Sequence, residues 1–296
     1  MKHLDTLFRM SAAELQEILR LSADLKAKFK QGGRPPILAG HVLALLFEKP
    51  SLRTRISFEV AMTHLGGSSI FLSAADAGLN GRESLPDVAR VLSCYCDCIV
   101  IRAYSQAMIE EAARYSECPI INGLSDVAHP CQAIADLMTV QELFGNLEGR
   151  TIAFVGDGNN VARSLALAAG LLKARFIMSS PAGYEFTPKY IDQMRQRIPD
   201  LDLQQISDPK KAVAKADVIY TDVWASMGQE AEAEKRKKIF APYQVNAELM
   251  AAAPKHAKFL HCLPARRGME VTDEVMDGPQ SAVFEQAENR LHSAKG

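Results

Sequence analysis

The segment from residue 47 to residue 55, F-E-K-P-S-L-R-T-R, places two arginines and two hydroxyl groups at the expected start of a helix. The apolar run at 41–47 predicts a buried strand, and helical spacing follows the segment, so Ser51 is the predicted N-cap. The first turn of a helix carries unpaired N–H groups and a partial positive charge, so Arg53 and Arg55 are unfavourable there unless an anion binds. The pattern therefore predicts a phosphate-binding turn. The alternative is a surface turn whose arginines extend outward.

Other polar side chains follow predicted strands directly, which is where open parallel sheets bind their ligands. In the first half of the chain, Arg102 follows an apolar run, and His129 and Gln132 lie at the opening of a helix. In the second half, the segments G-D-G-N-N at 156–160, D-V-W-A-S-M-G-Q-E at 222–230 and H-C-L-P at 261–264 have the same position. Each segment is a weak signal by itself, but together they indicate a binding site built at strand ends.

The glycine loop at 156–158 does not fit a dinucleotide site. The motif G-x-G-x-x-G needs glycine where Val161 stands, and no acid closes the next predicted strand, at 176–179. A nucleotide-dependent oxidoreductase is therefore disfavoured. Asn159 and Asn160 suit hydrogen bonds to a small polar ligand, with simple helix capping as the alternative. Asp222 is placed either to pair with an ammonium group or to cap its own turn.

The elements that would position these residues alternate between strands and helices, which favours parallel sheets covered by helices. After a helix capped by Ser11, the first half predicts strands at 42–47, 69–72, 98–101 and 119–121 and helices at 53–65, 86–95, 106–115 and 131–144. The second half predicts strands at 151–155, 176–179, 217–221 and 258–262 and helices at 161–173, 187–197, 209–215 and 230–240. The last of these helices offers Glu232 with Arg236 and Glu234 with Lys238, which is typical of a solvent-facing helix.

We predict an α/β protein of two doubly wound parallel-sheet domains with the active site in the cleft between them. The first domain spans 1–145 and is completed by a C-terminal helix at about 281–296. The second domain spans 146–280. A chain of 296 residues is long enough for two domains of ordinary size.

Composition narrows the class of protein. The chain is 48% hydrophobic with a formal charge of −1, which argues against a general nucleic-acid surface. No apolar run approaches the roughly 18 residues of a membrane span, and the N-terminus does not read as a secretory signal, so we expect a cytoplasmic protein. The six cysteines include no C-x-x-C pair, so we predict no metal site, and Cys94, Cys96 and Cys98 are expected to be small core residues.

The motifs S-L-R-T-R at 51–55, H-P-C-Q at 129–132, D-V-W-A-S-M-G at 222–228 and H-C-L-P at 261–264 occur in the order found in one family. The chain resembles the ornithine carbamoyltransferases over nearly its whole length, including E-N-R-L-H at 288–292. The first two motifs are typical of carbamoyltransferases in general. The last two motifs are typical of the ornithine branch.

The resemblance implies the residues of two half-sites. The half-site for carbamoyl phosphate would contain Ser51, Leu52, Arg53, Thr54, Arg102, His129, Gln132, Cys262, Leu263 and Arg290. The half-site for ornithine would contain Asn160, Asp222, Ser226 and Met227. The residues with catalytic roles would be Arg53, Arg102, His129 and Cys262. The family needs no cofactor, and it implies a homo-oligomer, with a trimer expected.

Two positions depart from the family pattern. Leu52 stands where threonine is commoner, which removes a hydroxyl contact but leaves a backbone N–H. Gly78 stands where relatives often carry a glutamine that reaches a neighbouring subunit's site, so Asn80 and Arg82 become candidates for that role. The site residues that the resemblance implies would serve either arginine synthesis or arginine breakdown.

The implied reaction is attack of the ornithine side-chain amine on carbamoyl phosphate, giving citrulline and phosphate. A lysine-type amine has an unperturbed pKa of about 10.4, so the site must favour its neutral form, and the rate should rise toward alkaline pH. The nearest alternative is a carbamoyltransferase for a related amine, such as a modified ornithine or putrescine. An alternative from another class is a non-catalytic sensor of a phosphorylated metabolite.

Overall fold

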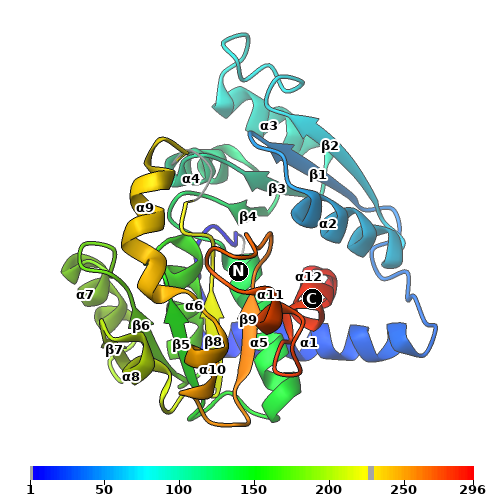
Figure 1. The fold of residues 1–296 in the computed structure, drawn as a ribbon. Coiled ribbons are helices and arrows are strands. Elements are labelled where there is room, and N and C mark those ends of the chain that lie inside the picture. Colours follow the sequence, from blue (N-terminus) through cyan, green and yellow to red (C-terminus); the bar gives the residue numbers. More distant parts are fainter. Residues whose placement is uncertain (1–2, 226–229) are drawn as a thin grey trace. The chain divides into compact units, whose positions relative to one another are not determined.

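The computed structural model describes residues 3–225 and 230–296. The chain forms two compact units: unit 1 comprises Met1–Met138 with Asn289–Gly296, and unit 2 comprises Thr139–Glu288. Each unit contains one sheet whose strands are all parallel and carry helices, so the predicted α/β class with two parallel-sheet domains is confirmed (Figure 1). The division runs through helix α5 (Pro130–Phe144), ahead of the junction at 146 that the sequence suggested.

The sheet of unit 1 has the strand order β2-β1-β3-β4. Its strands are β1 (Val42–Phe47), β2 (Ser68–Ser73), β3 (Cys98–Arg102) and β4 (Ile120–Leu124). In the register of the two central strands Phe47 lies opposite Arg102. Because parallel strands point the same way, β1 and β3 end at one edge, and this brings Arg102 beside the segment at 47–55.

The helices of unit 1 begin where the sequence offers caps. The Ser11 side chain accepts the Glu14 N–H while the Glu14 carboxylate accepts the Ser11 N–H, a capping box that starts α1 (Ala12–Lys30). The other helical segments of unit 1 are the short 3₁₀ turn η1 (Leu7–Arg9), α2 (Leu52–His64), α3 (Leu85–Tyr95), α4 (Gln106–Tyr115) and, from Asn289 onward, the last part of α12 (Val283–Lys295). Buried apolar residues of α3 and α4 pack on Ala44, Leu46 and Ile99 of the sheet.

The sheet of unit 2 has the order β7-β6-β5-β8-β9. Its strands are β5 (Thr151–Val155), β6 (Arg175–Ser179), β7 (Leu203–Gln205), β8 (Val218–Thr221) and β9 (Lys258–His261). Its helices and 3₁₀ turns are α6 (Asn160–Leu171), α7 (Pro188–Arg197), α8 (Pro209–Val213), η2 (Glu230–Glu232), α9 (Ala233–Phe240), η3 (Ala241–Tyr243), α10 (Ala247–Ala251) and α11 (Asp273–Met276). Thr221 lies opposite His261, so the residues that follow β8 and β9 emerge together.

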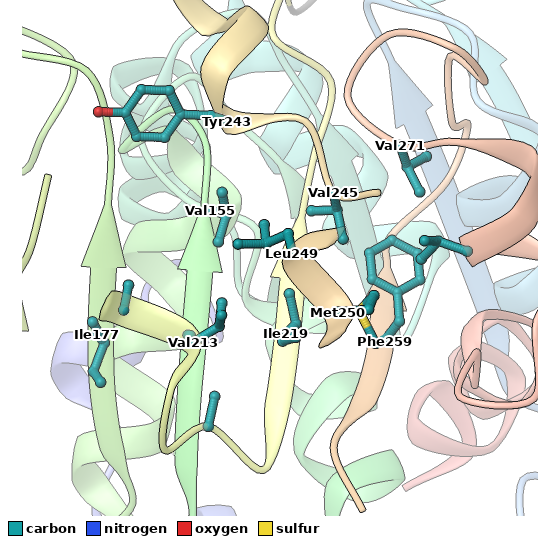
Figure 2. Packing of buried hydrophobic residues seen from close by; sticks show 14 of the residues in the cluster. Val155, Ile177, Val213, Ile219, Tyr243, Val245, Leu249, Met250, Phe259 and Val271 are labelled. Carbon is teal, nitrogen blue, oxygen red and sulfur yellow. The ribbon is translucent and has the colours of Figure 1, made fainter. Parts of the chain in front are cut away.

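The core on one face of this sheet is formed by α8, α10 and alternate strand residues. Figure 2 shows Val213 of α8 and Leu249 and Met250 of α10 lying against side chains of the strands. On the other face Phe154 stacks on Tyr220 with 5.2 Å between ring centroids. Alternation of side chains along each strand therefore fills both faces.

Several sequence predictions of local structure were incomplete or wrong. Strand β4 covers Ile120–Leu124 rather than 119–121, and β7, α10 and α11 were not predicted. Cys94 is exposed rather than part of the core. None of the described helices is long and apolar enough to cross a membrane.

Candidate functional site

The N-terminus of α2 has the predicted construction. Ser51 is the N-cap: its Oγ accepts the Thr54 N–H at 3.3 Å and lies 3.1 Å from the Thr54 hydroxyl. Leu52 is the first helical residue, and its apolar side chain is 74% exposed. Its backbone N–H is therefore the group through which Leu52 could bind an anion at the start of the helix. The turn contains no acid to offset its partial positive charge. It therefore remains suited to an anion.

The two arginines of this turn have different environments. The Arg55 guanidinium bonds to Glu59 at 2.9 Å and lies 3.9 Å from the centroid of the Phe71 ring. The expectation that Arg55 joins Arg53 in holding an anion is therefore wrong, because a carboxylate one turn away already neutralises it. Arg53, which is half-buried, is the arginine of this turn that stays a candidate.

Two buried arginines lie near His129 in unit 1. Arg102, at the end of β3, donates to the Thr54 hydroxyl at 3.5 Å, and Arg290 of α12 is 4% exposed. Burial lowers the pKa of His129 well below its ordinary value, and the charges of Arg290 and Arg102 lower it further. His129 is therefore neutral at physiological pH and can serve as a hydrogen-bond donor rather than as a cation.

Within the part of the chain that the structure describes, Nε and Nη1 of Arg290 are buried and have no hydrogen-bond partner. Buried guanidinium N–H groups without a partner are unfavourable, and hydrogen bonds from arginine to an anion are among the strong ones. We refer to Ser51, Thr54, Arg102, His129, Gln132 and Arg290 as the unit 1 cluster. Its chemistry fits an oxyanion.

Two further residues of unit 1 were missed or only partly understood from the sequence. Gln132 donates its side-chain amide to the buried Asp136 carboxylate at 2.8 Å, which leaves its carbonyl oxygen as an acceptor. Lys49, two residues before Ser51, is almost fully buried, and burial and the charge of Arg102 lower its pKa. Its position within the segment at 47–55 was the available signal, but the sequence did not show that it is buried.

The carboxylate of Asp222 is the centre of the second group of polar residues. Asp222 follows β8, is 7% exposed, and receives three hydrogen bonds from residues that the structure describes: from Asn159 Nδ2 at 2.8 Å, from its neighbour Val223 N at 2.8 Å and from Cys262 Sγ at 3.1 Å. None of these donors carries a charge, so a net negative charge remains. We refer to Asn159, Asn160, Asp222 and Cys262 as the unit 2 cluster. Its chemistry fits a cationic amine.

His261 and Glu270 hold the backbone beside Cys262. The His261 Nδ1 atom accepts the Leu263 N–H at 2.9 Å, so its Nε2 carries the proton and donates to Glu270 at 3.2 Å. Leu263 has a φ of 56°, a left-handed conformation unusual for leucine, and its bond to Pro264 is cis. The hydrogen-bonded pair of His261 and Glu270 therefore supports the loop after β9 that carries Cys262 and Leu263.

One group of residues has the composition of a metal site, although none was predicted. Ligand atoms of Asp222, His261 and Cys262 lie within 4.8 Å of one another. Both ring nitrogens of His261 already make hydrogen bonds, so a metal would displace either Leu263 or Glu270. The geometry fits a hydrogen-bonded support better than a resident metal site.

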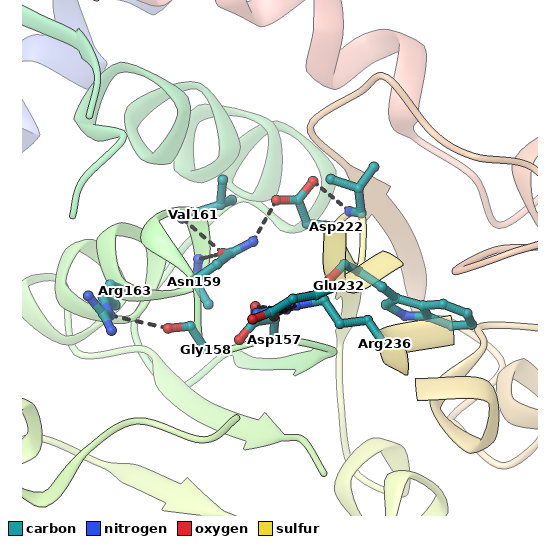
Figure 3. A network of polar contacts seen from close by, with 11 residues as sticks. Asp157, Gly158, Asn159, Val161, Arg163, Asp222, Glu232 and Arg236 are labelled. Carbon is teal, nitrogen blue, oxygen red and sulfur yellow. Dashed lines mark hydrogen bonds and ion pairs between the residues drawn. The ribbon is translucent and has the colours of Figure 1, made fainter. Parts of the chain in front are cut away.

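The two asparagines at the start of α6 differ in role. Asn159 is the N-cap, with Oδ1 accepting the N–H groups of Val161 and Ala162 at 3.0 Å each, and it also bonds to Asp222 (Figure 3). Asn160, the predicted ligand, is the first helical residue and its Oδ1 accepts the Val161 N–H at 3.0 Å. The sequence allows Asn159 either ligand contact or helix capping, and it does not predict the bond to Asp222.

Arg236 is not the solvent-facing residue that its helix pattern predicted. It is buried, pairs with Asp157 at 2.6 Å and donates to the Trp224 carbonyl at 2.9 Å, in addition to its predicted bond to Glu232 (Figure 3). It thus connects α9 to the loop after β5 and to Trp224, two residues after Asp222.

Ser226 and Met227, predicted to contact ornithine, lie outside the described residues.

The fold and the two clusters define a two-domain α/β protein in which one unit carries residues whose chemistry fits an oxyanion and the other carries residues whose chemistry fits an amine. Two family models match: the carbamoyl-P binding domain of aspartate/ornithine carbamoyltransferase over residues 2–142 and the Asp/Orn binding domain over residues 148–296. The chain belongs to the aspartate/ornithine carbamoyltransferase family.

Individual relatives agree over nearly full length. The chain is 50% identical to an anabolic ornithine carbamoyltransferase of Pyrococcus furiosus over 96% of this chain and 91% of the relative. It is 48% identical to the ornithine carbamoyltransferase of Anoxybacillus flavithermus over 98% of this chain and 93% of the relative. The solved structure of the Pyrococcus furiosus enzyme has a TM-score of 0.96 at 50% identity, covering 99% of this chain and 95% of that one. The Thermus thermophilus ornithine carbamoyltransferase has a TM-score of 0.90 at 43% identity, covering 100% and 96%.

Proposed function

We propose that this protein transfers the carbamoyl group of carbamoyl phosphate to the side-chain amine of L-ornithine, giving L-citrulline and phosphate. The observation that carries the proposal is the convergence of Arg102 and Arg290 on a neutral His129 near the acid-free N-terminus of α2. A doubly charged phosphate group would satisfy the buried guanidinium atoms and the helix N–H groups together. Relatives that carry the name ornithine carbamoyltransferase support the choice of substrates.

In the proposed reaction the amine nitrogen forms a bond to the carbonyl carbon, and the bond from that carbon to the phosphate oxygen breaks. The amine loses a proton, and phosphate leaves with the bonding pair. Negative charge grows on the carbonyl oxygen and on the leaving group, so Arg53, Arg102 and His129 act as fixed electrostatic partners. Such preorganised groups contribute about 3 kcal/mol each in other enzymes.

The unit 2 cluster suits the amino-acid end of ornithine. A carboxylate stabilises the charged form of a neighbouring amine, whereas the attacking amine must be neutral. We therefore assign Asp222 to the ammonium group of ornithine that does not react. Asn160, Ser226 and Met227 would make the other contacts to ornithine. The Cys262 thiol and the Leu263 backbone would lie where the two substrates meet.

We also propose that the working enzyme is a homotrimer. Leu52 and Ile56 are one helical turn apart on α2 and are 74% and 46% exposed, and Ile70 of β2 is exposed as well. Large apolar side chains grouped on neighbouring elements are typical of a surface that another protein covers. A second copy of the chain is the occupant that the family suggests.

An amine panel tests the choice of acceptor. The protein would be incubated with carbamoyl phosphate and, in separate reactions, with L-ornithine, N-acetyl-L-ornithine or putrescine, and the ureido products quantified. We expect L-ornithine to have the highest kcat/KM. A higher value for either other amine would replace ornithine in the proposal, and no turnover with any of them would favour a sensor of phosphorylated metabolites.

A further inference from the structure

The side chain of Asn159 makes hydrogen bonds at both ends. Its Oδ1 accepts the N–H groups of Val161 and Ala162 at the start of α6, and its Nδ2 donates to Asp222 Oδ2 at 2.8 Å (Figure 3). The two backbone donors fix which end of the amide is which, because a flipped amide would place its NH₂ against two N–H groups. The donor end is therefore held against the carboxylate.

This contact acts on the oxygen of Asp222 that has room for a ligand. An ionised carboxylate offers about two lone-pair positions on each oxygen. On Oδ1 both are occupied, by Val223 N–H and by the Cys262 thiol, whereas on Oδ2 the described residues supply Asn159 alone. The remaining acceptor position thus lies on Oδ2, the oxygen that Asn159 orients.

We propose that Asn159 is a positioning residue for substrate: it aims the free lone pair of Asp222 at the ammonium group of the amine substrate. The inference depends on the proposed function, because it assigns Asn159 a part in acceptor binding. The Asn159 side chain would then have two separate roles: its Oδ1 caps α6, and its Nδ2 positions Asp222. Aspartate caps helices about as well as asparagine, but it has no N–H to donate and would place a second negative charge beside Asp222.

Asn159→Asp separates the two tasks. We expect it to keep the cap and to hold the thermal midpoint within about 2 °C of the wild type, because aspartate and asparagine cap helices about equally well. We expect kcat/KM for ornithine to fall about 10- to 100-fold, the size of losing a hydrogen bond to a charged group. KM for carbamoyl phosphate should change less than about 2-fold, because the unit 1 cluster is untouched.

Asn246→Asp is the matched control. Asn246 is the N-cap of α10 in the same unit, and its Oδ1 accepts the Leu249 N–H at 3.0 Å. The same chemical change there should leave both substrates' kinetics at wild-type values. Asn159→Ser supplies a second variant. Serine caps a helix but is too short to reach Asp222, and unlike aspartate it adds no charge. It should therefore lower kcat/KM for ornithine less than Asn159→Asp does.

The outcomes distinguish this inference from the proposed function. If the wild-type protein forms citrulline but Asn159→Asp retains wild-type kcat/KM for ornithine, the positioning role is excluded while the function stands. If Asn159→Asp and Asn246→Asp lower activity and Tm alike, the effect is structural and the inference is again excluded. If the wild-type protein forms no citrulline, the proposed function fails first.

Discussion

At the level of single residues, phosphate binding depends on which cationic side chains can contact the phosphate group. Arg53 and Arg55 are only two positions apart, but Arg55 is neutralised by Glu59 and lies on the Phe71 ring. Replacing each arginine in turn therefore compares the proposed phosphate-binding residue, Arg53, with a residue that pairs with another side chain of its own helix, Arg55.

Arg53→Ala should raise KM for carbamoyl phosphate about 10- to 100-fold, because a hydrogen bond to a charged group contributes about 1.5–3 kcal/mol. Steady-state kinetics at saturating ornithine measure the change. Arg55→Ala is the control and should alter KM little. Equal effects of the two substitutions would remove Arg53 from the proposed phosphate site.

The depressed pKa of His129 has a consequence for stability. The folded protein holds His129 neutral, whereas the unfolded chain protonates it near its ordinary pKa of 6.5. As pH falls below 6.5 the unfolded state binds a proton that the folded state does not, so the free energy of unfolding declines by up to about 1.4 kcal/mol per pH unit. Above that pH this group contributes no slope.

His129→Asn should therefore flatten the decline in unfolding free energy between pH 6.5 and pH 5 relative to the wild type. Urea unfolding at each pH gives the comparison. His64 also has a lowered pKa, caused first by burial, so some slope will persist in the variant. An unchanged slope after the substitution would contradict the assignment of a neutral buried His129.

At the scale of secondary-structure elements, α9 is joined to the rest of unit 2 by Arg236. Its buried pair with Asp157 and its bond to the Trp224 carbonyl connect three segments around the unit 2 cluster. Burial raises the pKa of Asp157, and the bond from Arg236 opposes that shift. Removing the arginine alone would leave a buried carboxylate without its partner.

Arg236→Gln should lower the free energy of unfolding by about 3 kcal/mol, the cost of leaving one member of a buried ion pair unpaired. The chain's single tryptophan, Trp224, is buried against Phe240, so its fluorescence reports unfolding of this region. Asp157→Asn combined with Arg236→Gln should recover part of the loss. A double variant no more stable than Arg236→Gln would show that the carboxylate is not the source of the penalty.

Much of this element-level organisation was predictable from the sequence, and the reasons are local. The cap at Ser51, the capping box at Ser11 and the strands ending near Arg102, Asp222 and His261 follow from short patterns of apolar and capping residues. These patterns located the strand ends where the clusters form. The short elements β7, α10 and α11 carry three to five residues and too little periodicity to be recognised.

What the sequence did not predict depends on contacts between distant segments. Arg236 reads as a surface residue because its i−4 partner is Glu232, and only folding reveals Asp157, which lies 79 positions earlier. Asn159 reads as a cap, and only the parallel register of β5 and β8 brings Asp222 to its amide. Local patterns identify elements, but they do not specify partners far apart in the chain.

At the scale of the whole molecule, we expect three chains to associate. Glutamate at position 56 would introduce a charge one helical turn from the exposed Leu52 of α2, and burying an unpaired charge in an interface is strongly unfavourable. Ile56→Glu should therefore dissociate the assembly, whereas Ile56→Val should preserve it. Light scattering after gel filtration would give a mass of three times 32.4 kDa for the wild type and of one chain for Ile56→Glu. A wild-type mass of a single chain would contradict the trimer.

In the proposed reaction the unit 1 cluster binds a phosphate dianion before any chemistry takes place. Calorimetric titration of the wild-type protein with carbamoyl phosphate in the absence of ornithine measures this binding step alone. We expect saturable binding with one site per chain, weakened by added inorganic phosphate and nearly abolished in Arg53→Ala. A titration without saturable heat, or binding that neither phosphate nor Arg53→Ala changes, would contradict it.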